Sequence, residues 1–192
     1  MQRFSKWANW LLIPVLALLY FTGALSTIKA KVQQGLLEAG FFLPEVSASG
    51  TARAAGNYNF DLKTLDGRTV SLREMKNKVV FLNIWASWCP PCVAEMPGIH
   101  TLYQQLDSSK IAFVMLSVDE YDAALRNFLG RKKYTFPVYK AAGQIPEVYA
   151  SPSIPITFVL NKDGNIVFRH DGMANYNTDE FKQFLRKLAG EK

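Results

Sequence analysis

The sequence predicts an α/β domain built on a mixed β-sheet, preceded by a hydrophobic N-terminal segment. Two nearly continuous apolar stretches, 79–85 and 111–118, are typical of strands that are buried on both faces of a sheet. A helical pattern follows each stretch, and strands that alternate with helices indicate an α/β fold. A strand–turn–strand pattern over 156–168 predicts an antiparallel hairpin, which makes the sheet mixed.

Composition limits both the size of the fold and the classes of partner. The chain has 192 residues, 49% hydrophobic and 20% charged, which leaves room for one compact core and excludes a disordered polymer. The formal net charge is +6, and the densest basic run is Arg131-Lys132-Lys133. We interpret this run as a solvated helix end, so no nucleic acid is expected as a partner.

The N-terminal segment is long enough to cross a membrane. Residues 7–25 include no charged side chain, and a helix of this length spans most of a hydrocarbon layer about 30 Å thick. We predict a signal anchor over residues 1–26, with a single transmembrane helix at about 7–25. A cleaved signal peptide is the alternative, because Ala24-Leu25-Ser26 is a fair cleavage site. The short tail favours export of the remaining chain.

Residues 27–57 are predicted to connect the anchor to the domain. Apolar residues near helical spacing over 27–42 predict an amphipathic helix that lies on the membrane surface or docks on a partner. Small and polar residues over 44–57 are typical of a flexible linker. The folded domain is therefore expected to cover residues 58–192.

The elements of the domain follow in order. The first is a β-hairpin around the turn Asp66-Gly67, which precedes the buried strand at 79–85. Helices are predicted at about 91–106 and 123–132, and a short strand is predicted between the second of these helices and the terminal hairpin. The last helix, over 178–188, begins with a threonine placed as its N-cap.

The two cysteines of the chain carry its chemistry. The sequence Cys89-Pro90-Pro91-Cys92 comes directly after a buried strand and opens a helix. A helix N-terminus favours an anion, so the thiol pKa of Cys89 is expected to be depressed toward neutrality. Proline is tolerated in the first helical turn, where its missing N–H is no loss. This arrangement predicts a thiol pair that takes part in thiol–disulfide exchange.

Two other uses of the cysteines compete with redox chemistry. A structural disulfide across two intervening residues removes little entropy from the unfolded chain and adds little stability. A tetrahedral metal site would need unusual ligands, because His100 and His170 are the only histidines. We therefore predict a redox pair with no metal and no cofactor.

A resemblance to a known family rests on the residues around this pair. The stretch 85–92, Trp-Ala-Ser-Trp-Cys-Pro-Pro-Cys, resembles the active-site signature of thioredoxin-fold proteins. With Glu95, Pro97 and the N-terminal anchor, the chain is similar to membrane-tethered bacterial thiol-disulfide reductases of the TlpA/ResA type. The resemblance covers residue 58 to the C-terminus. It implies a thioredoxin-like sheet flanked by helices with an N-terminal β-hairpin extension, and it makes Cys89 the attacking and Cys92 the resolving cysteine.

The resemblance also implies where a substrate binds. The segment at 153–158 is similar to the family's cis-proline segment, which assigns Pro155 as the cis-proline. The backbone of Ile154 would then pair with an extended substrate segment near the disulfide. Trp88 is expected to form an apolar rim for the substrate, whereas Trp85 is expected to pack under the loop.

One position departs from thioredoxin, which carries a buried aspartate six residues before its first active-site cysteine. Asn83 occupies that position here and cannot take a proton. The resemblance to the tethered proteins points instead to Glu95, one helical turn beyond Cys92, with a pKa that burial would raise. The alternative is a surface carboxylate near the helix N-terminus. The acidic residues Asp119, Glu120 and Asp122 are interpreted as helix caps and solvent-facing charge.

The function expected from these observations is reduction of disulfides in exported proteins by a Cys89–Cys92 dithiol cycle. The resemblance implies a DsbD-like electron donor in the same bacterial inner membrane, with the catalytic domain in the periplasm or extracytoplasmic space. Apocytochrome c, before haem attachment, is one candidate substrate. The alternatives are a disulfide oxidase or isomerase of the same fold, because reduction potential sets the direction, and a copper- or zinc-handling dithiol protein.

Overall fold

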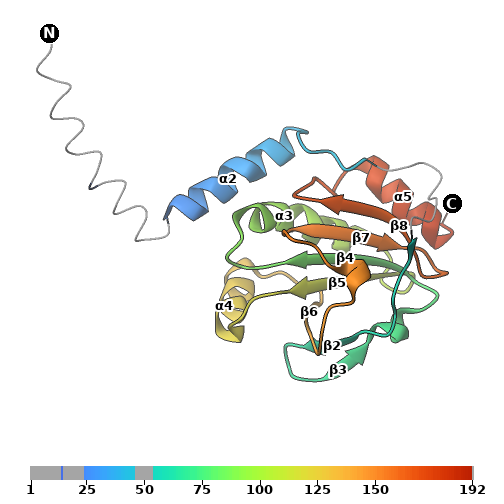
Figure 1. Ribbon diagram of the computed structural model, residues 1–192. Helices are drawn as coiled ribbons and strands as arrows, with labels where there is room; N and C mark the ends of the chain where they lie inside the picture. The colour runs from blue at the N-terminus through green and yellow to red at the C-terminus, as the bar shows by residue number, and fades with distance from the viewer. Residues whose placement is uncertain (1–13, 15–23, 46–53, 192) are drawn as a thin grey trace, which may run out of the picture.

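The computed structural model describes residue 14, residues 24–45 and residues 54–191 (Figure 1). Most of the predicted transmembrane segment at 7–25 and residues 46–53 of the predicted linker lie outside these described residues. Within the described ranges, no helix is both long enough and apolar enough to cross a membrane.

The described strands form one mixed sheet in the order β1-β8-β7-β4-β5-β6-β2-β3. Strand β4 is parallel to β5, which is parallel to β6, and the other neighbouring pairs are antiparallel. The predicted α/β fold with a mixed sheet is thus confirmed. The strands are β1 (Ala54–Ala55), β2 (Asp61–Thr64), β3 (Thr69–Ser71), β4 (Val79–Trp85), β5 (Ile111–Ser117), β6 (Val138–Ala141), β7 (Ile156–Leu160) and β8 (Asn165–Asp171).

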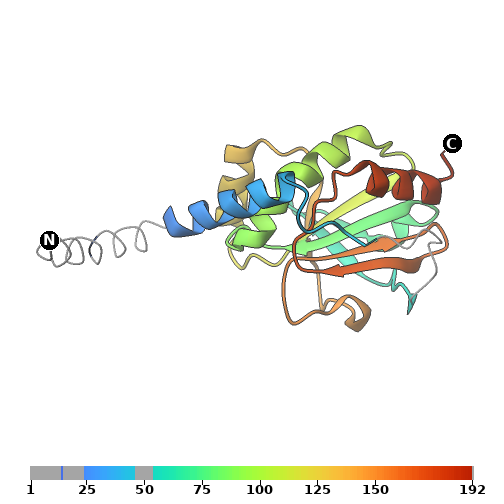
Figure 2. The same cartoon turned by 90° about the horizontal axis from the view of Figure 1, so that it is seen from above.

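The helices α3, α4 and α5 pack their buried side chains into one core on the same face of the sheet. Side chains on the opposite face form a second core together with β2 and two 3₁₀ turns, η1 and η2. Figure 2 shows α2 lying alongside α3. The helices and turns are α2 (Ala24–Glu38), α3 (Pro90–Gln105), α4 (Asp122–Lys132), α5 (Asp179–Ala189), η1 (Leu72–Met75) and η2 (Glu147–Tyr149).

Strand β4 is central to the sheet, and all seven of its residues are buried. Because side chains alternate along a strand, Phe81 and Trp85 join the core under the helices, whereas Leu82 and its alternate neighbours join the opposite core. Asn83 falls on the helix-covered face by the same alternation. This strand therefore brings one polar side chain under α3, next to the apolar core.

Ordered structure begins before Tyr58, within the segment predicted as a linker. Ala54 pairs with Ile166 of β8, and the Gly56 N–H donates to the Gly164 carbonyl at 2.8 Å. Strand β8 would otherwise expose a row of unpaired backbone groups at the sheet edge. Composition indicated a linker here. It could not reveal the pairing with β8, because that strand is distant in sequence.

The predicted amphipathic helix is present as α2, and its inner face docks on the domain itself. Ala30 and Leu37 are buried between α2 and the domain. Asn175 fixes the end of the helix, because its side chain donates to the Leu37 carbonyl and its N–H to the Phe42 carbonyl, both at 3.0 Å. The sequence did not predict this intramolecular docking, because amphipathicity does not identify the surface that a helix covers.

The turn between β7 and β8 yields the first prediction. Gly164 has φ +86°, and a Cβ there would overlap the ring of Tyr58, whereas Gly67, at φ +92°, has open space around it. Gly67→Ala should therefore lose about 1 kcal/mol of unfolding free energy from backbone strain alone. Gly164→Ala should lose a further 1–3 kcal/mol, roughly, from the overlap. Urea unfolding measures both values, and equal losses would contradict the packing argument.

Candidate active site

The cysteine pair lies where the central strand passes into a helix. Strand β4 ends at Trp85, and Cys89 is the N-cap of α3. The prolines at 90 and 91 carry no N–H, so the first amide of the helix that can reach the sulfur is that of Cys92. This N–H donates to the Cys89 sulfur at 3.4 Å. The helix N-terminus is thus aimed at the attacking sulfur, as the sequence predicted.

The two sulfurs are bonded to each other in this structure, which is the oxidised state of the pair. The Cα atoms of Cys89 and Cys92 are 5.3 Å apart. Cys89 is 4% exposed, whereas Cys92 is completely buried. A thiolate that approaches from solvent can therefore reach Cys89 but not Cys92, which is the asymmetry that a dithiol exchange requires.

The segment before β7 lies against the attacking sulfur. The carbonyl oxygen of Ile154 is 3.8 Å from the Cys89 sulfur. The bond between Ile154 and Pro155 is cis, as the resemblance implied. Trp88 is 64% exposed beside the pair. Trp85 is buried and packs on Phe128 of α4, with the ring centroids 5.7 Å apart.

Glu95 is buried, so the alternative of a surface carboxylate is wrong. Its Oε1 accepts from the Asn83 side chain at 2.8 Å, and its Oε2 accepts from the Ala174 N–H at 3.2 Å. Burial raises the pKa of Glu95 to about 8, although these two hydrogen bonds act in the opposite direction. The carboxyl is therefore mainly protonated at neutral pH, one helical turn from the buried Cys92.

A polar cluster that the sequence did not reveal holds Glu95 in place. The Asn83 side chain, on β4, also donates to the Thr157 hydroxyl at 2.9 Å. Thr157 belongs to β7 and follows Pro155 by two residues, so the cluster joins α3, β4 and the segment that contacts Cys89. Thr157 and Ala174 carry no motif. The pairing of β4 with β7 places Thr157 opposite Asn83, and the loop after β8 brings the Ala174 N–H to the carboxyl group.

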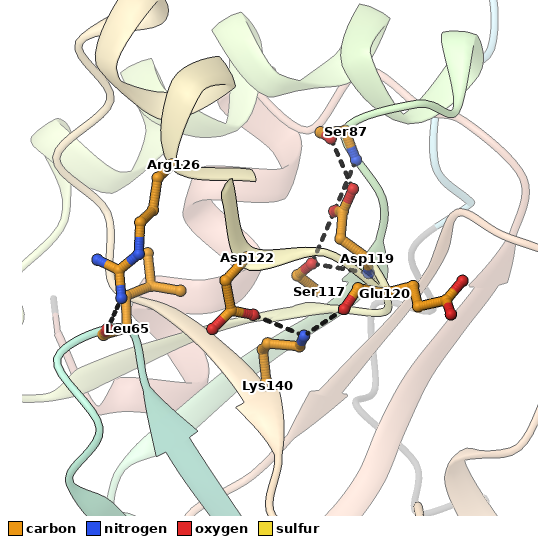
Figure 3. Close-up of polar contacts among 8 residues, drawn as sticks. All are labelled: Leu65, Ser87, Ser117, Asp119, Glu120, Asp122, Arg126 and Lys140. Atoms are coloured by element: carbon orange, nitrogen blue, oxygen red, sulfur yellow. Dashed lines mark hydrogen bonds and ion pairs between the residues drawn. The ribbon is translucent and has the colours of Figure 1, made fainter. Parts of the chain in front are cut away.

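Asp119 also differs from its predicted role, because it is buried rather than facing solvent. Its carboxylate accepts from the N–H and the hydroxyl of Ser87 at 2.9 and 2.6 Å, and from the Ser117 hydroxyl at 2.8 Å (Figure 3). Ser87 lies two residues before Cys89. Asp119 therefore fixes the loop that carries the cysteine, a role that required the parallel pairing of β4 and β5.

The other two acidic residues near the start of α4 do face solvent, as expected. Asp122 pairs with Lys140 at 2.7 Å, and Lys140 also donates to the Glu120 carbonyl (Figure 3). Nothing among the described residues groups three or more His, Cys, Asp or Glu side chains as a metal site would. His100, one of the two histidines, instead hydrogen-bonds Thr135, with 3.0 Å between its Nε2 and the Thr135 hydroxyl oxygen.

A thioredoxin-like sheet with a cysteine pair at the N-terminus of a helix defines a thiol-disulfide oxidoreductase. The chain belongs to the Redoxin family, whose pattern matches residues 42–185. It is 30% identical to the thiol-disulfide oxidoreductase ResA of Bacillus cereus over 181 residues, covering 94% of this chain and 97% of that protein. The thiol-disulfide oxidoreductase ResA of Bacillus anthracis is 32% identical, over 94% of this chain and 97% of that protein.

Solved structures agree with this assignment. StoA from Bacillus subtilis is 26% identical with a TM-score of 0.55, over 67% of this chain and 94% of that chain. A thiol:disulfide interchange protein of the thioredoxin family from Chlorobium tepidum is also 26% identical. Its TM-score is 0.60, over 73% of this chain and 99% of that chain. The chain is thus a TlpA/ResA-type thiol-disulfide oxidoreductase, with the activity of a protein-disulfide reductase.

Burial of Glu95 generates a prediction on pH. Its pKa is about 8 in the folded state against 4.5 for the ordinary group, so the folded protein binds more protons between these values. The unfolding free energy of the oxidised protein should then fall as pH rises from about 4.5 to about 8. Glu95→Gln should flatten this fall. The loss of unfolding free energy between about pH 4.5 and pH 9 should be smaller in the variant than in the wild type, by on the order of a few kcal/mol. Urea unfolding across this range measures the slope, and an unchanged slope would contradict the assignment.

The Asp119 carboxylate generates a second prediction. Asp119→Asn replaces one acceptor oxygen by a donor amide, so it should lower the unfolding free energy by about 1–3 kcal/mol. The freed loop should also change the rate at which iodoacetamide labels reduced Cys89. Asp122→Asn, at an exposed ion pair on the same segment, is the control and should change neither quantity appreciably. Equal effects of the two substitutions would show that burial of Asp119 has no special role.

Proposed function

We propose that the chain reduces disulfides of exported proteins from an anchored position at the outer face of a bacterial inner membrane. The observation that carries this proposal is the asymmetric pair, with Cys89 reachable at a helix N-terminus and Cys92 buried behind it. The reaction needs no cofactor, because the two thiols themselves supply both electrons.

The proposed cycle begins with the reduced pair. The Cys89 thiolate attacks one sulfur of a partner disulfide, a mixed disulfide forms, and the other partner sulfur leaves as a thiolate. Cys92 then loses its proton and attacks the Cys89 sulfur, which releases the second partner thiolate. Two electrons pass to the partner, whose two thiolates take up protons, and the Cys89–Cys92 disulfide remains.

Glu95 is proposed to accept the proton of Cys92 during this second step. The oxidised state is the state reached after resolution, and in that state the pKa of Glu95 is about 8 because of burial. A carboxyl group that holds a proton at this stage matches one that has just received it. When a donor reduces the pair again, the same proton returns to the departing Cys92 sulfur.

Ile154, Pro155 and Trp88 are proposed to bind the substrate. The Ile154 carbonyl lies beside the Cys89 sulfur, so a backbone that pairs with this segment brings its own disulfide within reach. Trp88 exposes most of its surface next to the pair, which suits an apolar contact with a partner.

The first 43 residues of the chain support a membrane location. The hydrophobic segment at 7–25 ends within the first two residues of α2, which begins at Ala24. The outward face of α2 exposes Ile28, Val32 and Leu36 at helical spacing, and the exposed apolar residues 41–43 follow it. An amphipathic helix of this kind suits the surface of a bilayer.

The partners follow from the same proposal. An oxidised reductase must be recharged before it can act again, so we propose a membrane electron donor of the DsbD-like type. Apocytochrome c, whose haem-site cysteines must be reduced before haem attachment, is one proposed substrate.

The reduction potential of the purified chain tests the direction of the reaction. We expect equilibration with glutathione to give a value near that of thioredoxin, about −270 mV, and not near that of the oxidant DsbA, about −120 mV. Reduced chain should also cleave the disulfides of insulin, and Cys89→Ser should abolish this activity. A potential near the DsbA value would overturn the reductase proposal and favour the oxidase.

A further inference from the structure

A groove of about 380 Å³ lies directly beside the active-site loop. Its lining comes from the docked helix α2, the active-site loop with the first turns of α3, and the end of α4. The lining includes Lys31 and Gln34 from α2, Trp88 from the loop, Pro90 at the start of α3, and Arg131 and Lys132 from α4.

The groove adjoins the attacking cysteine through the chain itself. Trp88 and Pro90, the residues on either side of Cys89, both line it. A partner whose disulfide reaches Cys89 therefore comes beside this groove. The groove is thus part of the surface on which a disulfide substrate lands.

The charge of the groove has a single sign. Lys31, Arg131 and Lys132 are exposed, and of the described residues that line the groove none is acidic. No ion pair joins these three side chains to a carboxylate anywhere in the described ranges. A second cavity along α2 differs, because Glu38 lines it and none of the described residues in its lining is basic. The positive charge is therefore specific to the groove at the cysteine.

A solvated helix end explains only part of this arrangement. Arg131 and Lys132 lie in the last turn of α4, where basic side chains stabilise a helix. Lys31 comes from a separate helix far away in sequence, and only the docking of α2 on α3 brings it to the same groove. Stabilisation of the α4 end therefore does not account for the third cation, Lys31.

We propose that this groove binds an acidic segment of the polypeptide whose disulfide is reduced at Cys89. The inference rests on the proposed function and adds the chemistry of the substrate, namely carboxylate side chains next to its cysteine. Three cations around a concave surface complement such a segment and raise its rate of productive encounter. An anionic lipid headgroup is the rival occupant, and it is disfavoured because the groove opens beside the exposed Trp88 and the reacting sulfur.

Two matched peptides test the inference. Each forms a disulfide-linked dimer through one cysteine, which is flanked by glutamates in one peptide and by glutamines in the other. The full chain, reduced and held in nanodiscs of neutral phosphatidylcholine, should reduce the acidic peptide with a kcat/KM about tenfold higher at low salt. Added salt should shrink this preference, because it screens exposed charges.

Charge-reversal variants assign the preference to the groove. Lys31→Glu alone should reduce the preference several-fold, and the combination with Arg131→Glu and Lys132→Glu should abolish or invert it. Reduction of the glutamine peptide by these variants should stay near the wild-type rate, which shows that the active site is intact. Lys76→Glu, at an exposed lysine beyond η1, is the matched control and should keep the full preference.

The remaining outcomes overturn the inference in distinguishable ways. Equal reduction of both peptides by the wild-type chain would remove the acidic substrate and leave the proposed function standing. Reduction of neither peptide would refute the proposed function and the inference with it. If the triple variant keeps the peptide preference but loses binding to phosphatidylglycerol vesicles, the three cations serve a lipid headgroup instead.

Discussion

The junction between the end of β4 and the start of α3 is the constraint on which the active site depends. Both neighbours of β4 in the sheet hydrogen-bond to it along most of its length, so its end at Trp85 has a fixed position. Only the short loop 86–88 separates this end from Cys89, the N-cap of the helix. The sulfur is therefore positioned by a strand that is buried along its whole length.

Two buried carboxyl groups support this junction in different ways. Asp119 accepts three hydrogen bonds from Ser87 and Ser117, which makes it a fixed anchor for the loop. Glu95 accepts only two, and burial dominates, so its pKa rises to about 8. Asp119 thus positions the chain, whereas the buried Glu95 is suited to exchange a proton.

Helix α2 extends the active site beyond the thioredoxin-like domain. Its inner face packs on α3 through Ala30 and Leu37, while Lys31 on a neighbouring face reaches the groove next to the cysteine loop. The same helix follows the hydrophobic N-terminal segment in the chain. A helix between the hydrophobic segment and the domain therefore also contributes a cation to the groove in which we propose that the substrate binds.

The sequence by itself determined the α/β class, the redox pair and the helix N-terminus at Cys89, because each depends on local pattern and spacing. It also indicated Glu95 and Pro155, although only through resemblance to a family. Tertiary structure alone decided that Asp119 is buried against the cysteine loop, that β1 closes the sheet edge, and that Lys31 joins the end of α4. These features depend on contacts between segments distant in the chain, and no local periodicity records which surface a residue will meet.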